Sequence, residues 1–108
     1  MNDRIRKINA LIKEEASSAI LKELSLKNGV FVTVTKVDTS ADLRYTRVSV
    51  RVFPQKDVQY AMRTLEHEKG MIQRSLYKRL HLRTVPIISF VYDRTGEDVD
   101  EIERLLKE

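Results

Sequence analysis

The 108-residue sequence contains no cysteine and no tryptophan, and it has only three glycines and two prolines. The absence of cysteine excludes disulfide bonds, thiolate metal ligands and cysteine nucleophiles, and it is typical of proteins in a reducing compartment. No apolar run approaches the roughly 20 residues that a membrane helix needs, and the first residues are charged, unlike a signal peptide. We therefore expect one soluble domain in the cytoplasm, with no membrane contact.

Acidic residues are missing from one segment of the chain. The sequence has 20 Lys and Arg and 16 Asp and Glu, yet the segment from Lys69 to Tyr92 holds five basic residues and no acidic one. Residues 93–108, in contrast, hold seven acidic and three basic residues. A basic segment without compensating acids is typical of a surface that contacts phosphate. The charge distribution therefore favours an anionic partner, with an acidic tail that either shields the basic face or is simply solvated.

The first half of the sequence predicts a helix and two strands. Apolar residues at intervals of three and four predict an amphipathic helix over residues 4–26, which Asn28-Gly29 ends. Residues 30–37 are dense in β-branched side chains and predict a strand. The alternation over residues 45–52 predicts a second strand with one buried face, and the five residues between the two strands favour a hairpin.

The second half predicts two helices and a third strand. Helical periodicity over residues 57–68 and 70–83 is interrupted at Gly70, where we expect a bend. Pro86 precedes a third strand over residues 87–92, which we expect to be buried. The order α-β-β-α-α-β predicts a two-layer α+β domain over residues 1–95, and we expect residues 96–108 to form a short acidic helix or tail.

The basic residues are candidates for RNA contacts. Arg74, Lys78 and Arg79 share a helix with apolar residues at other positions, so we expect them to face outward and contact phosphates; a solvated basic face is the alternative. Arg83 either contacts RNA or binds the last carbonyls of that helix. The further candidates are Lys69, then Arg4, Arg6 and Lys7 at the start of the first helix, and Arg47 and Arg51 beside Tyr45 on the exposed face of the second strand.

Residues that would support catalysis or metal binding are scarce. His67 and His81 are the only histidines and have too few good ligands at suitable spacing for a zinc site. Asp38 and Asp42 flank a turn, where backbone hydrogen bonds explain them better than a hydrolytic pair. No phosphate-binding loop, dinucleotide motif or catalytic triad pattern is present. We expect no enzymatic activity, no metal, no cofactor and no small-molecule substrate.

Several segments, in this order and spacing, resemble one family. They are residues 31–38, 40–43, 48–50, 70–76, 80–90 and 92–93. Together they are similar to the ribosome-binding factor A family, and the similarity covers residues 4–93. It implies a KH-like fold of the prokaryotic type, in which an Ala-x-Gly bend replaces the RNA-clamping GxxG loop. Here the bend is Glu68-Lys69-Gly70, so a glutamate stands in place of the usual alanine, and Ser25-Leu26-Lys27 stands where the family often has Asp-Pro-Arg.

The resemblance also implies a function. The chain is expected to be a monomeric, non-catalytic factor that binds the small (30S) ribosomal subunit and its precursor RNA. It would assist late maturation and processing of small-subunit ribosomal RNA, with a role in cold adaptation. The alternatives are a protein-interaction module that uses the sheet edge or the first helix, and, more remotely, an enzyme subunit whose catalytic groups lie on another chain.

Overall fold

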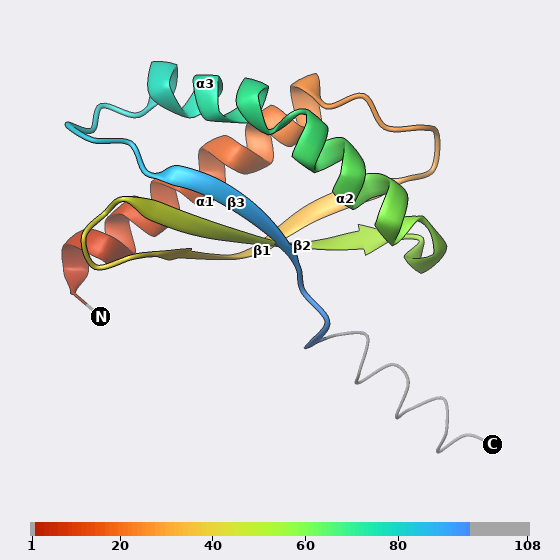
Figure 1. Ribbon diagram of the computed structural model, residues 1–108, viewed down its shortest axis with the longest axis horizontal. Helices are drawn as coiled ribbons and strands as arrows, with labels where there is room; N and C mark the ends of the chain where they lie inside the picture. Colours follow the sequence, from red (N-terminus) through yellow and green to blue (C-terminus); the bar gives the residue numbers. More distant parts are fainter. Residues whose placement is uncertain (1, 96–108) are drawn as a thin grey trace.

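The computed structural model describes residues 2–95, which form three helices packed on one side of a three-stranded sheet (Figure 1). The order α-β-β-α-α-β predicted from the sequence is confirmed. The predicted acidic helix or tail at residues 96–108 lies outside the described residues, and the domain boundary at residue 95 stays a prediction. The elements are α1 (Asp3–Glu23), β1 (Phe31–Thr39), β2 (Tyr45–Phe53), the short 3-10 helix η1 (Gln55–Asp57), α2 (Val58–His67), α3 (Lys69–Arg79) and β3 (Ile87–Tyr92).

Helix α1 begins at a side-chain cap and packs through its predicted apolar stripe. The Asn2 Oδ1 atom accepts a hydrogen bond from the Ile5 amide at 2.8 Å, which satisfies one of the free donors of the first turn. The buried residues of the helix recur at intervals of three and four, as predicted, and so form one face. They are Ile8, Ile12, Ala16, Ala19 and Ile20.

Helix α1 ends at Glu23, earlier than the predicted end at residue 26. Leu24 has an extended backbone (φ −79°, ψ 124°), and its side chain packs against the core. The Lys27 amide donates a hydrogen bond to the Tyr60 hydroxyl at 2.9 Å, and the Lys27 ammonium lies 2.7 Å from the buried Asp57 carboxylate. Because these contacts fix the segment outside the helix, Gly29 (φ 87°) makes a turn before β1 and does not end α1.

The sheet has the order β1-β2-β3, with β2 in the centre. The predicted hairpin is confirmed: β1 and β2 pair antiparallel, with Phe31 opposite Phe53 and a register irregularity between Val34 and Lys36. Strand β3 pairs with β2 in parallel, with Tyr45 opposite Ile87. The alternation predicted for β2 is also confirmed, because its inward residues are buried beneath the helices. These residues are Thr46, Val48, Val50 and Val52.

The prediction that β3 is a buried strand is wrong. The strand lies at an edge of the sheet, and its first three residues alternate between exposed and buried, as a pleated strand does. Ile87 is 57% exposed and Ser89 is exposed, whereas Ile88 is buried. Burial therefore does not account for the absence of acidic residues along β3.

The break between α2 and α3 falls on Glu68, within the predicted Glu68-Lys69-Gly70 bend. Glu68 has φ −95° and ψ 7°, a conformation open to residues other than glycine, so glutamate fits there. Its amide donates to the Thr64 carbonyl at 2.9 Å and its carbonyl accepts from the Met71 amide at 3.0 Å, so it ends one helix and starts the next. Gly70 belongs to α3, and its φ is not positive.

Replacing Gly70 with alanine is therefore expected to raise the free energy of unfolding by about 0.5–1 kcal/mol, because alanine favours a helix more than glycine does. A Cβ atom at this position would meet the Arg74 Nη1 atom at 3.5 Å, an ordinary van der Waals contact. Gly29→Ala is the matched control and is expected to cost about 1 kcal/mol, because its φ of 87° strains any other residue. Urea unfolding measures both variants. A destabilised Gly70→Ala variant would show that the bend requires glycine.

The core lies between the helices and the inner face of the sheet. Ile12 of α1, Leu65 of α2 and both Ile72 and Leu76 of α3 are fully buried, and they belong to the same cluster as Ile88. Each helix therefore contributes to one core. Among residues 2–95, no helix is both long enough and apolar enough to cross a membrane.

Candidate nucleic-acid interface

Helix α3 presents its basic residues to solvent, as predicted. Its buried Ile72 and Leu76 face the core, and Arg74, Lys78 and Arg79 are exposed. The helix ends at Arg79 and not at Arg83, because Leu80 takes an extended conformation (φ −91°, ψ 125°) with its side chain buried in the core. The three cations thus form the α3 basic face, and their contact with RNA stays a prediction.

The α3 basic face is less isolated from acids than the sequence indicates. Because α1 packs against α3, Glu23 lines the same surface hollow as Arg74, Lys78 and Arg79. At the start of the helix, the Lys69 Nζ atom lies 2.8 Å from the Glu66 Oε1 atom, so an ion pair spans the break between α2 and α3. The acid-free segment of the sequence therefore has acidic neighbours in space. Because its charge is already paired, Lys69 is a weaker candidate for phosphate contact than the sequence indicates.

A second basic cluster forms where the start of α1, the β1–β2 turn and the α3–β3 loop meet, at the left end of Figure 1. One hollow there is lined by Arg4, Arg44 and Arg83, together with Asp42. Arg4 and Arg83 were predicted as separate candidates, whereas Arg44 was not predicted as a site residue. These three arginines form what we call the end cluster. No local sequence pattern indicates it, because its members come from three distant segments.

Neighbouring residues reduce the charge of this end only in part. Arg44 pairs loosely with Asp42, with 3.9 Å between the Nε and Oδ2 atoms. Arg6 lies 3.7 Å from Asp3 on the same helix, in an exposed pair that contributes little. Lys7 is exposed on α1, and Arg83 is exposed in the loop, four positions beyond the end of α3.

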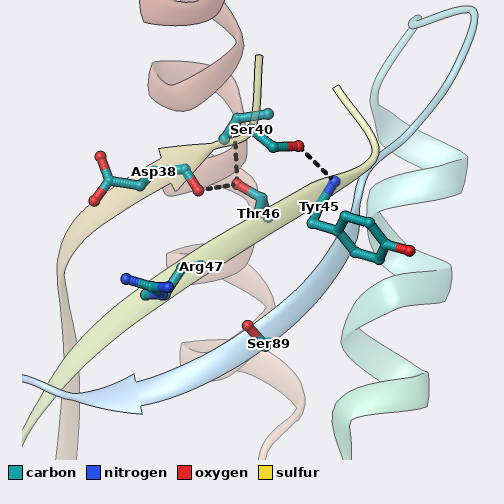
Figure 2. Close-up of a pocket in the computed structure, with 7 residues that line it drawn as sticks. Asp38, Ser40, Tyr45, Thr46, Arg47 and Ser89 are labelled. Atoms are coloured by element: carbon teal, nitrogen blue, oxygen red, sulfur yellow. Dashed lines mark hydrogen bonds between the residues drawn. The ribbon is translucent and has the colours of Figure 1, made fainter. Parts of the chain in front are cut away.

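The outer face of the sheet carries Arg47 and Arg51, both exposed as predicted. Arg47 lies opposite Asp38 of β1 and Ser89 of β3, and all three line one hollow (Figure 2). Figure 2 shows the Tyr45 ring and the Arg47 side chain directed away from each other, so they do not form a joint stacking surface.

The polar residues that surround this hollow stabilise the hairpin. The Thr46 hydroxyl lies 3.1 Å from the Asp38 carbonyl and 2.7 Å from the Thr39 hydroxyl (Figure 2). The Thr39 hydroxyl also lies 2.6 Å from the Asn9 Oδ1 atom, which joins the hairpin to α1. Asp38 has its own partner, because its Oδ2 atom lies 3.3 Å from the Lys36 Nζ atom. Asp38 therefore lies within β1, and its carboxylate pairs with Lys36 and not with the turn backbone, contrary to the prediction. Asp42 does bond the turn backbone, as predicted, because it accepts from the Arg44 amide.

Two carboxyl groups at the ends of the sheet have a pKa below the ordinary value of 3.8. The Ser40 hydroxyl, at 2.7 Å, and the Arg44 amide, at 3.1 Å, lower the pKa of Asp42. The Thr95 amide, at 3.0 Å, and the Thr35 hydroxyl, at 2.7 Å, lower the pKa of Asp93. In both cases donated hydrogen bonds favour the ionised form.

These shifts predict a loss of stability in acid. A carboxyl group with a lower pKa in the folded state stabilises the fold above its unfolded pKa, and this contribution is lost as the pH falls through the folded pKa. We expect the free energy of unfolding to fall below about pH 4, and to fall less steeply in an Asp42→Asn/Asp93→Asn variant. Urea unfolding between pH 2.5 and pH 7, chosen to span roughly both limits, measures the difference. An identical acid dependence in the double variant would contradict this assignment.

The chain matches known proteins over almost its whole length. The sequence model of the ribosome-binding factor A family matches residues 4–106. The ribosome-binding factor A of Natranaerobius thermophilus is 39% identical over 106 residues, which cover 97% of this chain and 81% of that protein. The ribosome-binding factor A of Dictyoglomus thermophilum is 37% identical over 110 residues, with 100% and 92% covered.

Solved structures confirm the fold. The crystal structure of ribosome-binding factor A from Thermus thermophilus has a TM-score of 0.72 and 22% identity, covering 84% of this chain and 97% of that one. A homology model of the Thermus thermophilus factor, fitted into a cryo-electron microscopy map of a 30S complex, has a TM-score of 0.67 and 24% identity, covering 81% of this chain and 92% of that one. The α+β, KH-like architecture predicted from the sequence is thus confirmed, and the chain belongs to the ribosome-binding factor A family.

Proposed function

We propose that this protein binds the small ribosomal subunit and its precursor RNA in the cytoplasm, as a monomer, and assists late maturation of the small-subunit ribosomal RNA without catalysing a reaction. Family membership over residues 4–106 is the observation that carries this proposal. A homology model of the Thermus thermophilus factor has been fitted into a map of a 30S complex, which supports the same partner for this chain.

Electrostatic contacts to RNA phosphates explain how such binding would work. The α3 basic face and the end cluster expose arginine and lysine side chains that can donate to phosphate oxygens. Phosphate contacts fix the position of a protein on RNA without reading its sequence. The protein therefore recognises the folded subunit by the arrangement of its phosphates, with Arg47 and Arg51 of the sheet as further contacts.

Co-sedimentation of the full chain with purified ribosomal subunits tests the proposal. We expect binding to the small subunit and not to the large subunit, with an affinity that falls linearly on a log–log plot as salt rises. Equal binding to both subunits, or no binding to either, would overturn the proposed partner. Binding to the small subunit that does not depend on salt would favour the protein-interaction alternative.

The role in maturation needs a cellular test. Deletion of the gene is expected to cause precursor small-subunit RNA to accumulate and to slow growth most at low temperature. Complementation with the unaltered gene is the control. Normal RNA processing in the deletion strain, in the cold as well as at the optimum, would contradict the maturation role.

The position of Glu23 predicts a variant that binds RNA more tightly. Glu23 lines the hollow of the α3 basic face, where its charge opposes an incoming phosphate. Glu23→Gln is expected to strengthen binding to the small subunit about two- to fivefold at low salt, by removing one like charge near the phosphate. Titration of labelled protein with subunits measures the change. Glu14→Gln, an exposed residue on the same helix, is the control, and an equal gain there would indicate a net-charge effect alone.

A further inference from the structure

Two exposed phenylalanines face each other at one end of the hairpin. Phe31 of β1 pairs directly with Phe53 of β2, and they are 64% and 69% exposed. Val32 and Val52, their neighbours in sequence, pack inward, so both rings lie on the outer face of the sheet, opposite the helices. Directly paired residues in an antiparallel sheet have Cβ atoms only about 5 Å apart, so the rings form one aromatic surface.

The aromatic surface borders a hollow with a positive charge and hydroxyl groups. Its lining is formed by Phe31, Thr33, Thr35, Arg51, Val52 and Phe53. No acidic side chain is among these lining residues of the described chain, in contrast to the hollow around Arg47, which Asp38 lines. The Asp93 carboxylate lies beside the hollow, because it accepts the Thr35 hydroxyl at 2.7 Å, and its charge also interacts with Arg51.

We propose that this hollow binds an unpaired RNA nucleotide, with the base stacked on Phe31 and Phe53 and a phosphate bound by Arg51. Every base has a flat π face that can stack on an aromatic ring, and arginine binds phosphate with two parallel hydrogen bonds. Arg51 and Phe53 are two residues apart on β2, a separation of about 7 Å. A base and a neighbouring phosphate of one RNA strand can therefore reach both side chains. The Thr33 hydroxyl, opposite Arg51, can donate to or accept from a base edge or a 2′-hydroxyl.

This proposal rests on the proposed function and extends it, because it specifies that the sheet recognises unpaired RNA. A duplex cannot use the site, since its bases are already stacked and paired. The α3 basic face, in contrast, can contact phosphates of either form. The protein would therefore hold folded RNA through its helix and a single-stranded segment through its sheet.

Fluorescence anisotropy with the full chain tests the stacking site. The probes are a labelled eight-nucleotide oligouridine and an RNA duplex of equal length. In the Phe31→Leu/Phe53→Leu variant, which keeps the apolar character and loses the aromatic faces, we expect about tenfold weaker binding of the single strand and unchanged binding of the duplex. Leu21→Ala, at an exposed apolar position on α1, is the control and should change neither. Urea unfolding verifies that the leucine variant is folded.

Photo-cross-linking provides a second readout. Oligouridine that carries 5-iodouridine is expected to cross-link to peptides that contain Phe31 or Phe53, and excess unlabelled oligouridine should prevent this. Equal single-strand binding by the original protein and the leucine variant, or cross-links on α3 alone, would overturn the proposal. Either result would mean that the phenylalanines serve another occupant, such as a protein partner or residues 96–108 of the chain itself. If the original protein still co-sediments with the small subunit, the proposed function survives and only the stacking site fails.

Discussion

Replacing Arg74, Lys78 and Arg79 together with glutamate is expected to abolish co-sedimentation with the small subunit at physiological salt. All three side chains are exposed on one helix whose opposite side is anchored in the core, so the change removes charge without removing packing. Each lost phosphate contact makes the negative slope of log affinity against log salt shallower by roughly 0.7–0.9. Three lost contacts, together with the repulsion of three new carboxylates, predict roughly a hundredfold loss or more.

A charge-matched control separates this surface from net charge. Lys13, Lys56 and Arg63 are also exposed and lie outside both basic clusters, so their joint replacement by glutamate changes the net charge equally. We expect that variant to retain most of its binding. If both variants lose binding equally, net charge alone governs association. If the α3 variant binds normally and is folded, the α3 basic face is not the RNA contact.

Ile72→Ala is expected to lower the free energy of unfolding by about 2–5 kcal/mol. Ile72 is fully buried and belongs to the main core cluster, so truncation leaves a cavity where the side chain packed. Since small domains are stable by only about 5–15 kcal/mol, one substitution would remove a large share of the stability. Denaturant unfolding measures it, with m-values compared to verify two-state behaviour.

Tyr77→Ala is the control on the same helix. Tyr77 is 55% exposed, and its replacement is expected to change stability by less than about 0.5 kcal/mol. A cost below about 1 kcal/mol for Ile72→Ala would show that α3 is not anchored as tightly as its burial indicates. The contrast between the two variants thus tests which face of α3 the core holds.

The elements of this fold could be predicted because their signals are local. The apolar stripe of α1 and the alternation along β2 follow from the geometry of a helix and a strand, and both were predicted from the spacing of apolar residues. The helix ends were less predictable. Leu24 and Leu80 take extended backbone conformations just after their helices, and their side chains pack against the core. The sequence alone does not indicate these tertiary contacts.

The surface around the candidate site was harder to predict than the elements. That Arg74, Lys78 and Arg79 face outward follows from helical spacing. The approach of Glu23 to these residues depends on how α1 packs on α3, and the end cluster depends on three segments meeting. The pairing of Phe31 with Phe53 depends on the hairpin register. An alternating sequence does not fix this register, because a shift of two residues keeps the same side chains on the buried face.

The three arginines of the end cluster are synthesised at different times, so the cluster can assemble only late in folding. Arg4 emerges first during synthesis, Arg44 follows with the hairpin, and Arg83 arrives just before the last strand. The Gln73 side chain helps to place that strand, because its amide bonds the Pro86 carbonyl and the Ile88 amide, both at 2.9 Å. A nascent chain therefore lacks the assembled cluster until β3 has paired. The anion binding proposed for this end would therefore be a property of the finished domain, and its onset would serve as a measure of complete folding.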